Sequence, residues 1–121
     1  MESLGESTED YLEKILMLSE RNGSVRSIDL ARELHFSKPS ISIAMKKLVD
    51  KGYVIMGDDK EIHLTEAGHE AAAHTYERHK TLIKLLTILG VEQGTAEEDA
   101  CRIEHDISDE TFERIKEFVN K

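Results

Sequence analysis

A stretch near the middle of the chain restricts the possible folds more than any other feature of the sequence. Apolar residues recur at helical spacing over residues 27–34 and again over residues 37–49, and only two residues separate the segments. Ser27 and Ser37 are placed to cap these two helices, and Pro39 falls in the first turn of the second, where proline is tolerated. Two short helices joined by so tight a turn predict a helix-turn-helix.

Two β-rich runs follow this pair of helices directly. Residues 53–56 and 61–64 flank the turn-forming dipeptide Gly57-Asp58, which is typical of a hairpin. A hairpin at this point makes the predicted fold a winged helix, with the hairpin as a two-stranded wing. We therefore expect a mainly α protein in which an N-terminal winged helix-turn-helix is followed by a helical dimerisation domain.

The remaining segments are expected to be helical, because a single proline leaves long helices uninterrupted. We place the winged-helix domain at residues 1–68 and the helical domain at residues 69–121. The four further helices are expected over about residues 8–21, from Thr65 as cap to about Leu89, from a capping box at residues 95–98 to near His105, and from Ser108 onward.

The helical domain is too small to bury its own apolar faces, so we expect a second copy of the chain to cover them. A homodimer also suits two half-sites on double-stranded DNA. The side chains expected to be buried in this way are Leu82, Leu85, Leu86, Leu89, Phe112 and Phe118.

Charge is distributed unevenly along the chain. The formal net charge is −9, which by itself opposes binding to a nucleic acid. Residues 22–52 nevertheless carry six basic and three acidic side chains, whereas residues 91–113 carry nine acidic side chains and only Arg102 as a base. The basic excess therefore coincides with the predicted helix-turn-helix.

The second helix of that motif has the composition of a DNA-reading helix. Small hydroxyl side chains and lysines near a helix N-terminus suit contacts with phosphates and base edges in the major groove. An acidic wing tip at residues 58–61 and the apolar Ile43 are expected to weaken this contact. The predicted DNA-binding residues are Arg26, Ser27, Ser37, Lys38, Pro39, Ser40, Ser42, Ile43, Lys46 and Lys47.

A second group of residues has the chemistry of a metal site. Cys101, Glu104 and His105 have the i, i+3, i+4 spacing that places three side chains on one helical face. Asp10 and Glu13 form a further i, i+3 pair of carboxylates. With His79 these are all competent ligands for first-row metals, and together they could hold one or two ions if their three helices converge.

Several motifs in this order resemble the diphtheria toxin repressor and manganese transport regulator family over nearly the whole chain. The motifs occupy residues 8–15, 37–42, 64–68, 78–79 and 101–105. The resemblance implies metal-activated repression of metal-uptake genes. By position, it also implies metal ligation by Asp10, Glu13, His79, Cys101, Glu104 and His105, and base reading by Pro39, Ser40, Ser42 and Ile43.

The ligand set implied by this resemblance is a hybrid. Asp10 and Glu13 match the manganese-type members, whereas Cys101 matches the iron-type members. Ile83 stands where many relatives carry a glutamate ligand, and Glu97 is a possible substitute. The expected cofactor is Fe(II) or Mn(II), with Zn(II), Co(II) or Ni(II) able to bind in vitro. No third, SH3-like domain is expected.

The expected mechanism is an electrostatic switch. Without metal the acidic residues repel one another, and a divalent cation would neutralise them and bridge the first helix to the helical domain. The alternatives are a metal-independent winged-helix regulator, a metalloenzyme and a winged helix that binds only proteins. We expect no enzyme and no small-molecule substrate, because no general base or substrate loop stands apart from these ligands.

The cellular location follows from two simpler features. No apolar run approaches the ~20 residues that cross a bilayer, and no signal peptide begins the chain. The single cysteine cannot form a disulfide within the chain, which favours a reducing compartment. We expect a cytoplasmic protein without a membrane partner.

Overall fold

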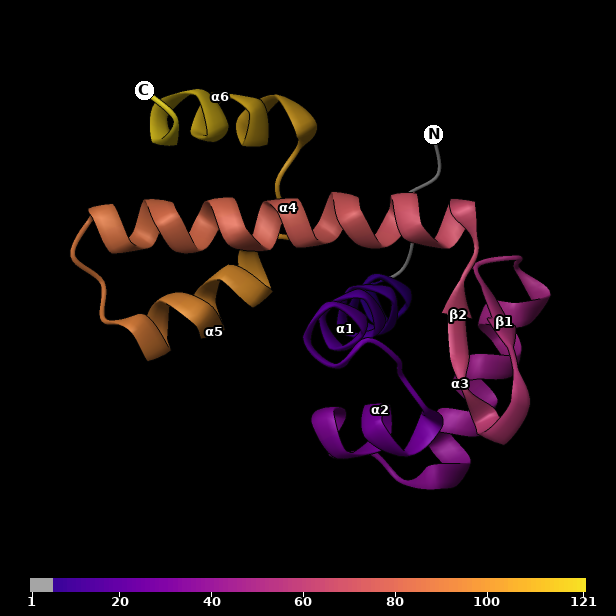
Figure 1. Cartoon of the computed structure of the whole chain (residues 1–121). Coiled ribbons are helices and arrows are strands. Elements are labelled where there is room, and N and C mark those ends of the chain that lie inside the picture. Colours follow the sequence, from indigo (N-terminus) through magenta and orange to yellow (C-terminus); the bar gives the residue numbers. More distant parts are fainter. Residues whose placement is uncertain (1–5) are drawn as a thin grey trace. The chain divides into compact units, whose positions relative to one another are not determined.

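The computed structural model describes residues 6–121, which form two compact units (Figure 1). The N-terminal unit ends at Ala73 and the C-terminal unit begins at His74, so the boundary falls within one helix. The elements are α1 (Glu6–Asn22), α2 (Ser27–Leu34), α3 (Lys38–Asp50), β1 (Val54–Met56), the 3-10 turn η1 (Asp58–Lys60), β2 (Ile62–Leu64), α4 (Glu66–Ile88), α5 (Gln93–Ile103) and α6 (Asp109–Val119).

The N-terminal unit is a winged helix-turn-helix, as the sequence predicts. Its core consists of apolar side chains from α1, the segment before α2, α2, α3 and the hairpin, all less than a tenth exposed. His35 ends α2 in the left-handed conformation, with φ 58°, and this allows the turn into α3 to be so short. The core residues are Leu12, Ile15, Leu16, Leu18, Val25, Leu30, Ala31, Ile41, Met45, Leu48, Val54 and Ile62.

The wing is an antiparallel hairpin that is anchored at its base. Ile55 pairs with His63 at the centre of the two strands. The Ile62 amide donates to the carbonyl oxygen of Val25, and a bridge joins Arg26 to Glu61. The second strand therefore pairs with β1 on one side and with the segment that leads into α2 on the other.

Two helices have N-cap residues other than those predicted. Arg26, not Ser27, is the N-cap of α2, and the Asp29 carboxylate accepts from the Arg26 amide at 3.0 Å. Glu92, not Thr95, caps α5 by accepting from the Thr95 amide. The backbone N–H groups of Gly94 and Thr95 hold the pKa of Glu92 below its usual range. At α5 a carboxylate thus replaces the predicted hydroxyl cap, whereas at α2 the Asp29 carboxylate binds the amide of the N-cap residue itself.

The junction between the wing and α4 depends on Thr65 and Gly68. The Thr65 hydroxyl donates to the carbonyl oxygen of Gly52 at 2.6 Å and accepts from the Gly68 amide at 3.1 Å. A Cβ at Gly68 would lie 1.9 Å from the carbonyl oxygen of Tyr53. The helix therefore starts against the backbone that precedes β1, and only glycine permits this approach.

We predict that Gly68→Ala destabilises the protein by about 2–3 kcal/mol or more, because the backbone must move to admit the methyl group. Urea unfolding followed by circular dichroism measures this loss. Gly94→Ala is the matched control, since its Cβ would meet only the Glu92 side chain and alanine favours the helix. Equal stability of the two variants would contradict the close approach at Gly68.

The C-terminal unit places α5 and α6 on either side of its portion of α4 (Figure 1). Leu82 and Phe112 are buried within the chain, so the prediction that a second copy must cover them is wrong. Leu89 and Phe118 are 66% and 53% exposed, as that prediction requires. Leu85 and Leu86 are half-buried.

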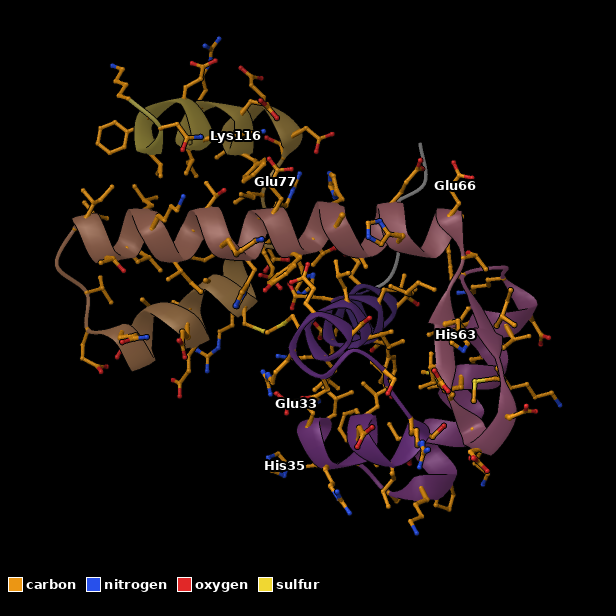
Figure 2. All side chains as sticks on the ribbon, viewed as in Figure 1. Glu33, His35, His63, Glu66, Glu77 and Lys116 are labelled. Atoms are coloured by element: carbon orange, nitrogen blue, oxygen red, sulfur yellow. The ribbon has the colours of Figure 1, made fainter. Side chains whose placement is uncertain are left out.

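An ion pair links α4 to α6 on the exposed surface. Figure 2 shows Glu77 and Lys116 pointing toward one another, and their side chains form a salt bridge. The hydrogen bond and the negative charge of Glu77 raise the pKa of Lys116. Within residues 6–121, no helix combines the length and apolar character needed to cross a bilayer.

Candidate metal centre and nucleic-acid interface

A buried imidazole-carboxylate pair lies inside the C-terminal unit. His79 on α4 and Glu104 at the end of α5 are 9% and 1% exposed, and His79 Nδ1 lies 2.8 Å from Glu104 Oε2. A carboxylate bonded to one nitrogen of an imidazole orients the ring for metal binding, and a carboxylate can itself be a ligand. The sequence predicted both residues as ligands, and the fold brings them together from positions 25 residues apart.

The second oxygen of Glu104 has the environment that a cation would stabilise. Glu104 Oε1 is buried and accepts no hydrogen bond from the described residues. His105 Nε2 lies 3.5 Å from this oxygen. A buried carboxylate oxygen is costly unless a donor or a cation compensates it, so a divalent ion fits this position.

Cys101 and His105 complete the ligand-bearing end of α5. A carboxylate oxygen of Glu104 and the Cys101 sulfur lie within 4.8 Å of one another, a separation that a shared ion can span. The helix ends at Ile103, two residues earlier than predicted, so Glu104 is the C-cap and His105 lies beyond it. The side chain of His105 is still only 3% exposed. The proposed substitute ligand Glu97 is instead exposed and accepts from Gln93.

The other two predicted ligands belong to the N-terminal unit. Glu13 on α1 is fully buried and Asp10, one turn earlier, is half-buried. Thiolate, imidazole and carboxylate are the donors that first-row divalent metals accept, so the chemistry of the six residues fits such an ion.

Every predicted DNA-binding residue is accessible in the N-terminal unit. Ser27 is half-buried and the other nine are exposed. Ser37 has a structural role as well, because its hydroxyl accepts from the Ser40 amide and donates to the Ser40 hydroxyl. The accessible residues on α3 therefore include lysines, and the helix begins with a serine cap that is hydrogen-bonded to Ser40.

A groove runs beside the start of α2, α3 and the wing turn. It contains two adjoining pockets of about 120 and 300 Å³ that share Ser27, Ser42 and Lys60. Lys38 lines the first pocket and Lys46 lines the second. Sequence reasoning missed Lys60 because the wing tip is acidic as a whole, yet the turn, with φ 59° at Lys60, gives this lysine a place in the groove.

Comparison with known proteins places this architecture in a family. The family model described as "Iron dependent repressor, N-terminal DNA binding domain" matches residues 3–62, and the model described as "Iron dependent repressor, metal binding and dimerisation domain" matches residues 65–121. The chain therefore belongs to the iron-dependent repressor family of metal-dependent transcriptional repressors.

Individual relatives agree with this assignment. An HTH-type transcriptional regulator of Methanocaldococcus jannaschii is 40% identical over 120 residues, which cover 98% of this chain and 96% of the relative. The transcriptional regulator MntR of Escherichia coli is 33% identical over 96% of this chain and 75% of its own length. These relatives are described as transcriptional regulators rather than as enzymes.

A solved structure shares the fold. The structure of a manganese-dependent transcriptional repressor in complex with manganese matches with a TM-score of 0.83 and 29% identity over 93% of this chain. This chain spans 52% of the length of the chain in that structure.

We predict that Cys101→Ser removes the thiolate-to-metal charge-transfer absorption of the Co(II)-loaded protein without abolishing Co(II) binding, because the carboxylate and imidazole donors remain. Anaerobic Co(II) titration followed by absorption spectroscopy measures both effects. Arg102→Lys, at an exposed neighbour on α5, is the control and should retain the band. A wild-type protein that binds Co(II) without this band would exclude the sulfur as a ligand.

Proposed function

We propose that this chain is a homodimeric repressor that binds double-stranded operator DNA when loaded with Fe(II) or Mn(II), and that it controls metal-uptake genes. The observation that carries the proposal is the buried His79–Glu104 pair, with Cys101 beside it, in the part of the chain that matches the metal-binding and dimerisation model. A site of this composition supports a metal-dependent regulator over a metal-independent one, which has no need to bury these groups together.

The proposed ligands are Asp10, Glu13, His79, Cys101, Glu104 and His105. Residues 1–68 would form the DNA-binding domain and residues 69–121 the metal-binding and dimerisation domain. Metal binding would favour the DNA-competent state to the extent that the ion binds this state more tightly. A bound divalent ion supplies positive charge, and the chain's own carboxylates would then no longer repel one another.

The donor set favours Fe(II) over Mn(II). Carboxylates suit Mn(II), whereas a thiolate beside imidazole shifts preference toward metals later in the first row. Zn(II), Co(II) and Ni(II) should therefore also bind in vitro, and availability in the cell would select the physiological ion.

The proposed dimer uses the apolar side chains that the chain leaves uncovered. Ile88, Leu89 and Phe118 are 58%, 66% and 53% exposed, and they come from the end of α4 and from α6. Large apolar side chains at such exposure favour contact with another protein surface, and the family model for this region includes dimerisation.

We predict that metal strengthens DNA binding by about 5- to 150-fold, the range typical of coupling between two ligands. A duplex selected from a random library under anaerobic conditions with Fe(II) serves as the probe. Fluorescence anisotropy then compares the protein with Fe(II), with Mn(II) and with chelator.

Glu104→Gln should reduce the difference between metal and chelator, whereas Glu97→Gln on the exposed surface of α5 should leave it unchanged. Equal affinity with metal and with chelator would support the metal-independent regulator instead. Failure to select any duplex, when the selection is run with Fe(II) and again with chelator, would favour a winged helix that contacts only proteins.

The exposed face of α3 suggests how the operator is read. Ile43 is 61% exposed and lies on the side of the helix opposite the buried Ile41, Met45 and Leu48. An apolar side chain in the major groove can recognise the C5-methyl group of thymine. Ile43 would thus contribute specificity where a polar residue would form a hydrogen bond.

We predict that replacing one thymine of the selected duplex by uracil weakens binding about fourfold, which corresponds to about 0.8 kcal/mol for one buried methyl group. Scanning each thymine by anisotropy identifies the position. Ile43→Ala should abolish the difference between thymine and uracil. Ile55→Ala on β1, another exposed isoleucine, should leave it intact, and the reverse result would assign the methyl contact to the wing.

A further inference from the structure

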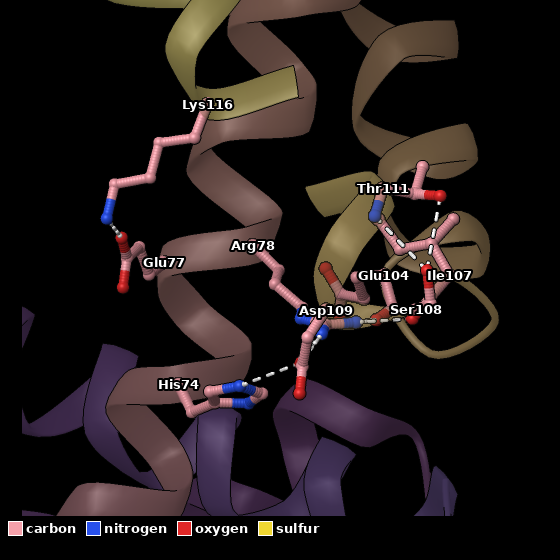
Figure 3. Close-up of polar contacts among 9 residues, drawn as sticks. All are labelled: His74, Glu77, Arg78, Glu104, Ile107, Ser108, Asp109, Thr111 and Lys116. Carbon is pink, nitrogen blue, oxygen red and sulfur yellow. Dashed lines mark hydrogen bonds and ion pairs between the residues drawn. The ribbon is translucent and has the colours of Figure 1, made fainter. Parts of the chain in front are cut away.

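One buried cation joins three segments of the C-terminal unit. Arg78 on α4 is 6% exposed, and its Nη1 donates to the carbonyl oxygens of Glu104 and Ile107 at 3.3 and 2.8 Å. Its Nη2 pairs with the carboxylate of Asp109 (Figure 3). The same guanidinium therefore holds the end of α5, the turn that follows and the first residue of α6.

An aromatic ring from α6 completes the surroundings of this guanidinium. The Arg78 Cζ lies 5.2 Å from the centre of the Phe112 ring, within the range of a cation–π contact. Only arginine offers a planar fork of donors that can reach two carbonyl oxygens and a carboxylate at once. A lysine in this position could replace the charge but not this pattern of hydrogen bonds.

Glu104 is held at two points by consecutive residues of α4. Arg78 binds its backbone carbonyl oxygen, while His79 contacts its carboxylate. Rotation of the Glu104 backbone would break the first contact, and rotation of its side chain would break the second. The position of this carboxylate is thus fixed from α4 before any ion binds.

We propose that Arg78 is a positioning residue for the metal centre, acting on the ion only through Glu104 and the turn to α6. This inference rests on the proposed function, because it requires Glu104 to be a ligand. Residues that orient metal ligands without touching the metal typically change its affinity by about 10- to 100-fold when replaced.

A neighbouring contact separates this role from general support of the fold. Glu77, one residue before Arg78, ties α4 to α6 through Lys116 but touches neither Glu104 nor the turn. A merely structural role predicts that loss of either tie affects metal binding to a similar extent. The positioning role predicts an effect of Arg78 alone.

The experiment is an anaerobic Co(II) titration of the full chain, followed by absorption spectroscopy. Arg78→Lys should weaken Co(II) binding by about 10- to 100-fold and alter the ligand-field bands, whereas Glu77→Gln should do neither. In a Glu104→Gln background, Arg78→Lys should cause no further loss, because the group that it positions is no longer a carboxylate ligand.

Asp109→Asn is the milder variant if Arg78→Lys fails to fold. It weakens the same contact while keeping both carbonyl hydrogen bonds, so a smaller loss of Co(II) affinity is expected. Unchanged affinity in Arg78→Lys, or equal losses in the presence and absence of Glu104, would overturn the positioning role. Absence of Co(II) binding by the wild-type protein would instead overturn the proposed metal site itself.

Discussion

The burial of the Glu104 carboxylate is the constraint on which the C-terminal unit depends. A carboxylate that is 1% exposed loses its hydration, and this loss costs several kcal/mol unless nearby groups compensate it. His79 provides that compensation at one oxygen, and Arg78 fixes the backbone beside it. The packing of α4 against the turn between α5 and α6 is therefore organised by polar contacts, which are directional, and not by apolar area alone.

These polar contacts hold the end of α5 against α4, while apolar surface remains exposed elsewhere in the unit. Leu82 and Phe112 form part of a small core, whereas the end of α4 and one side of α6 remain exposed. A unit of this size has little apolar area to spare, so polar residues in its interior imply that other surfaces supply stability. The family model that matches this region is described as a dimerisation domain as well as a metal-binding one.

Much of the fold could be predicted because its signals are local. Helical periodicity, serine caps and a Gly-Asp turn each involve residues within a few positions of one another, and they define the winged helix correctly. The errors are also local in origin. The carboxylate of Glu92 fulfils the capping role expected of Thr95, and α2 begins one residue early with Arg26 as its N-cap, whose amide donates to Asp29. The contact of Gly68 with Tyr53 has no local signal, because it depends on how α4 begins against the wing.

The candidate sites show the same division between residue type and position. Cys101, Glu104 and His105 could be chosen from spacing because a ligand must have a particular donor atom. Arg78 and Lys60 could not be chosen in this way, because each lies beside groups that are far away in the sequence. Arg78 donates to the carbonyl oxygen of Ile107, and Lys60 lines the same groove as Ser27. Net charge is equally uninformative here, since the lysines of the candidate DNA interface lie on α3 and the wing, while the acidic residues that dominate the total include the candidate metal ligands.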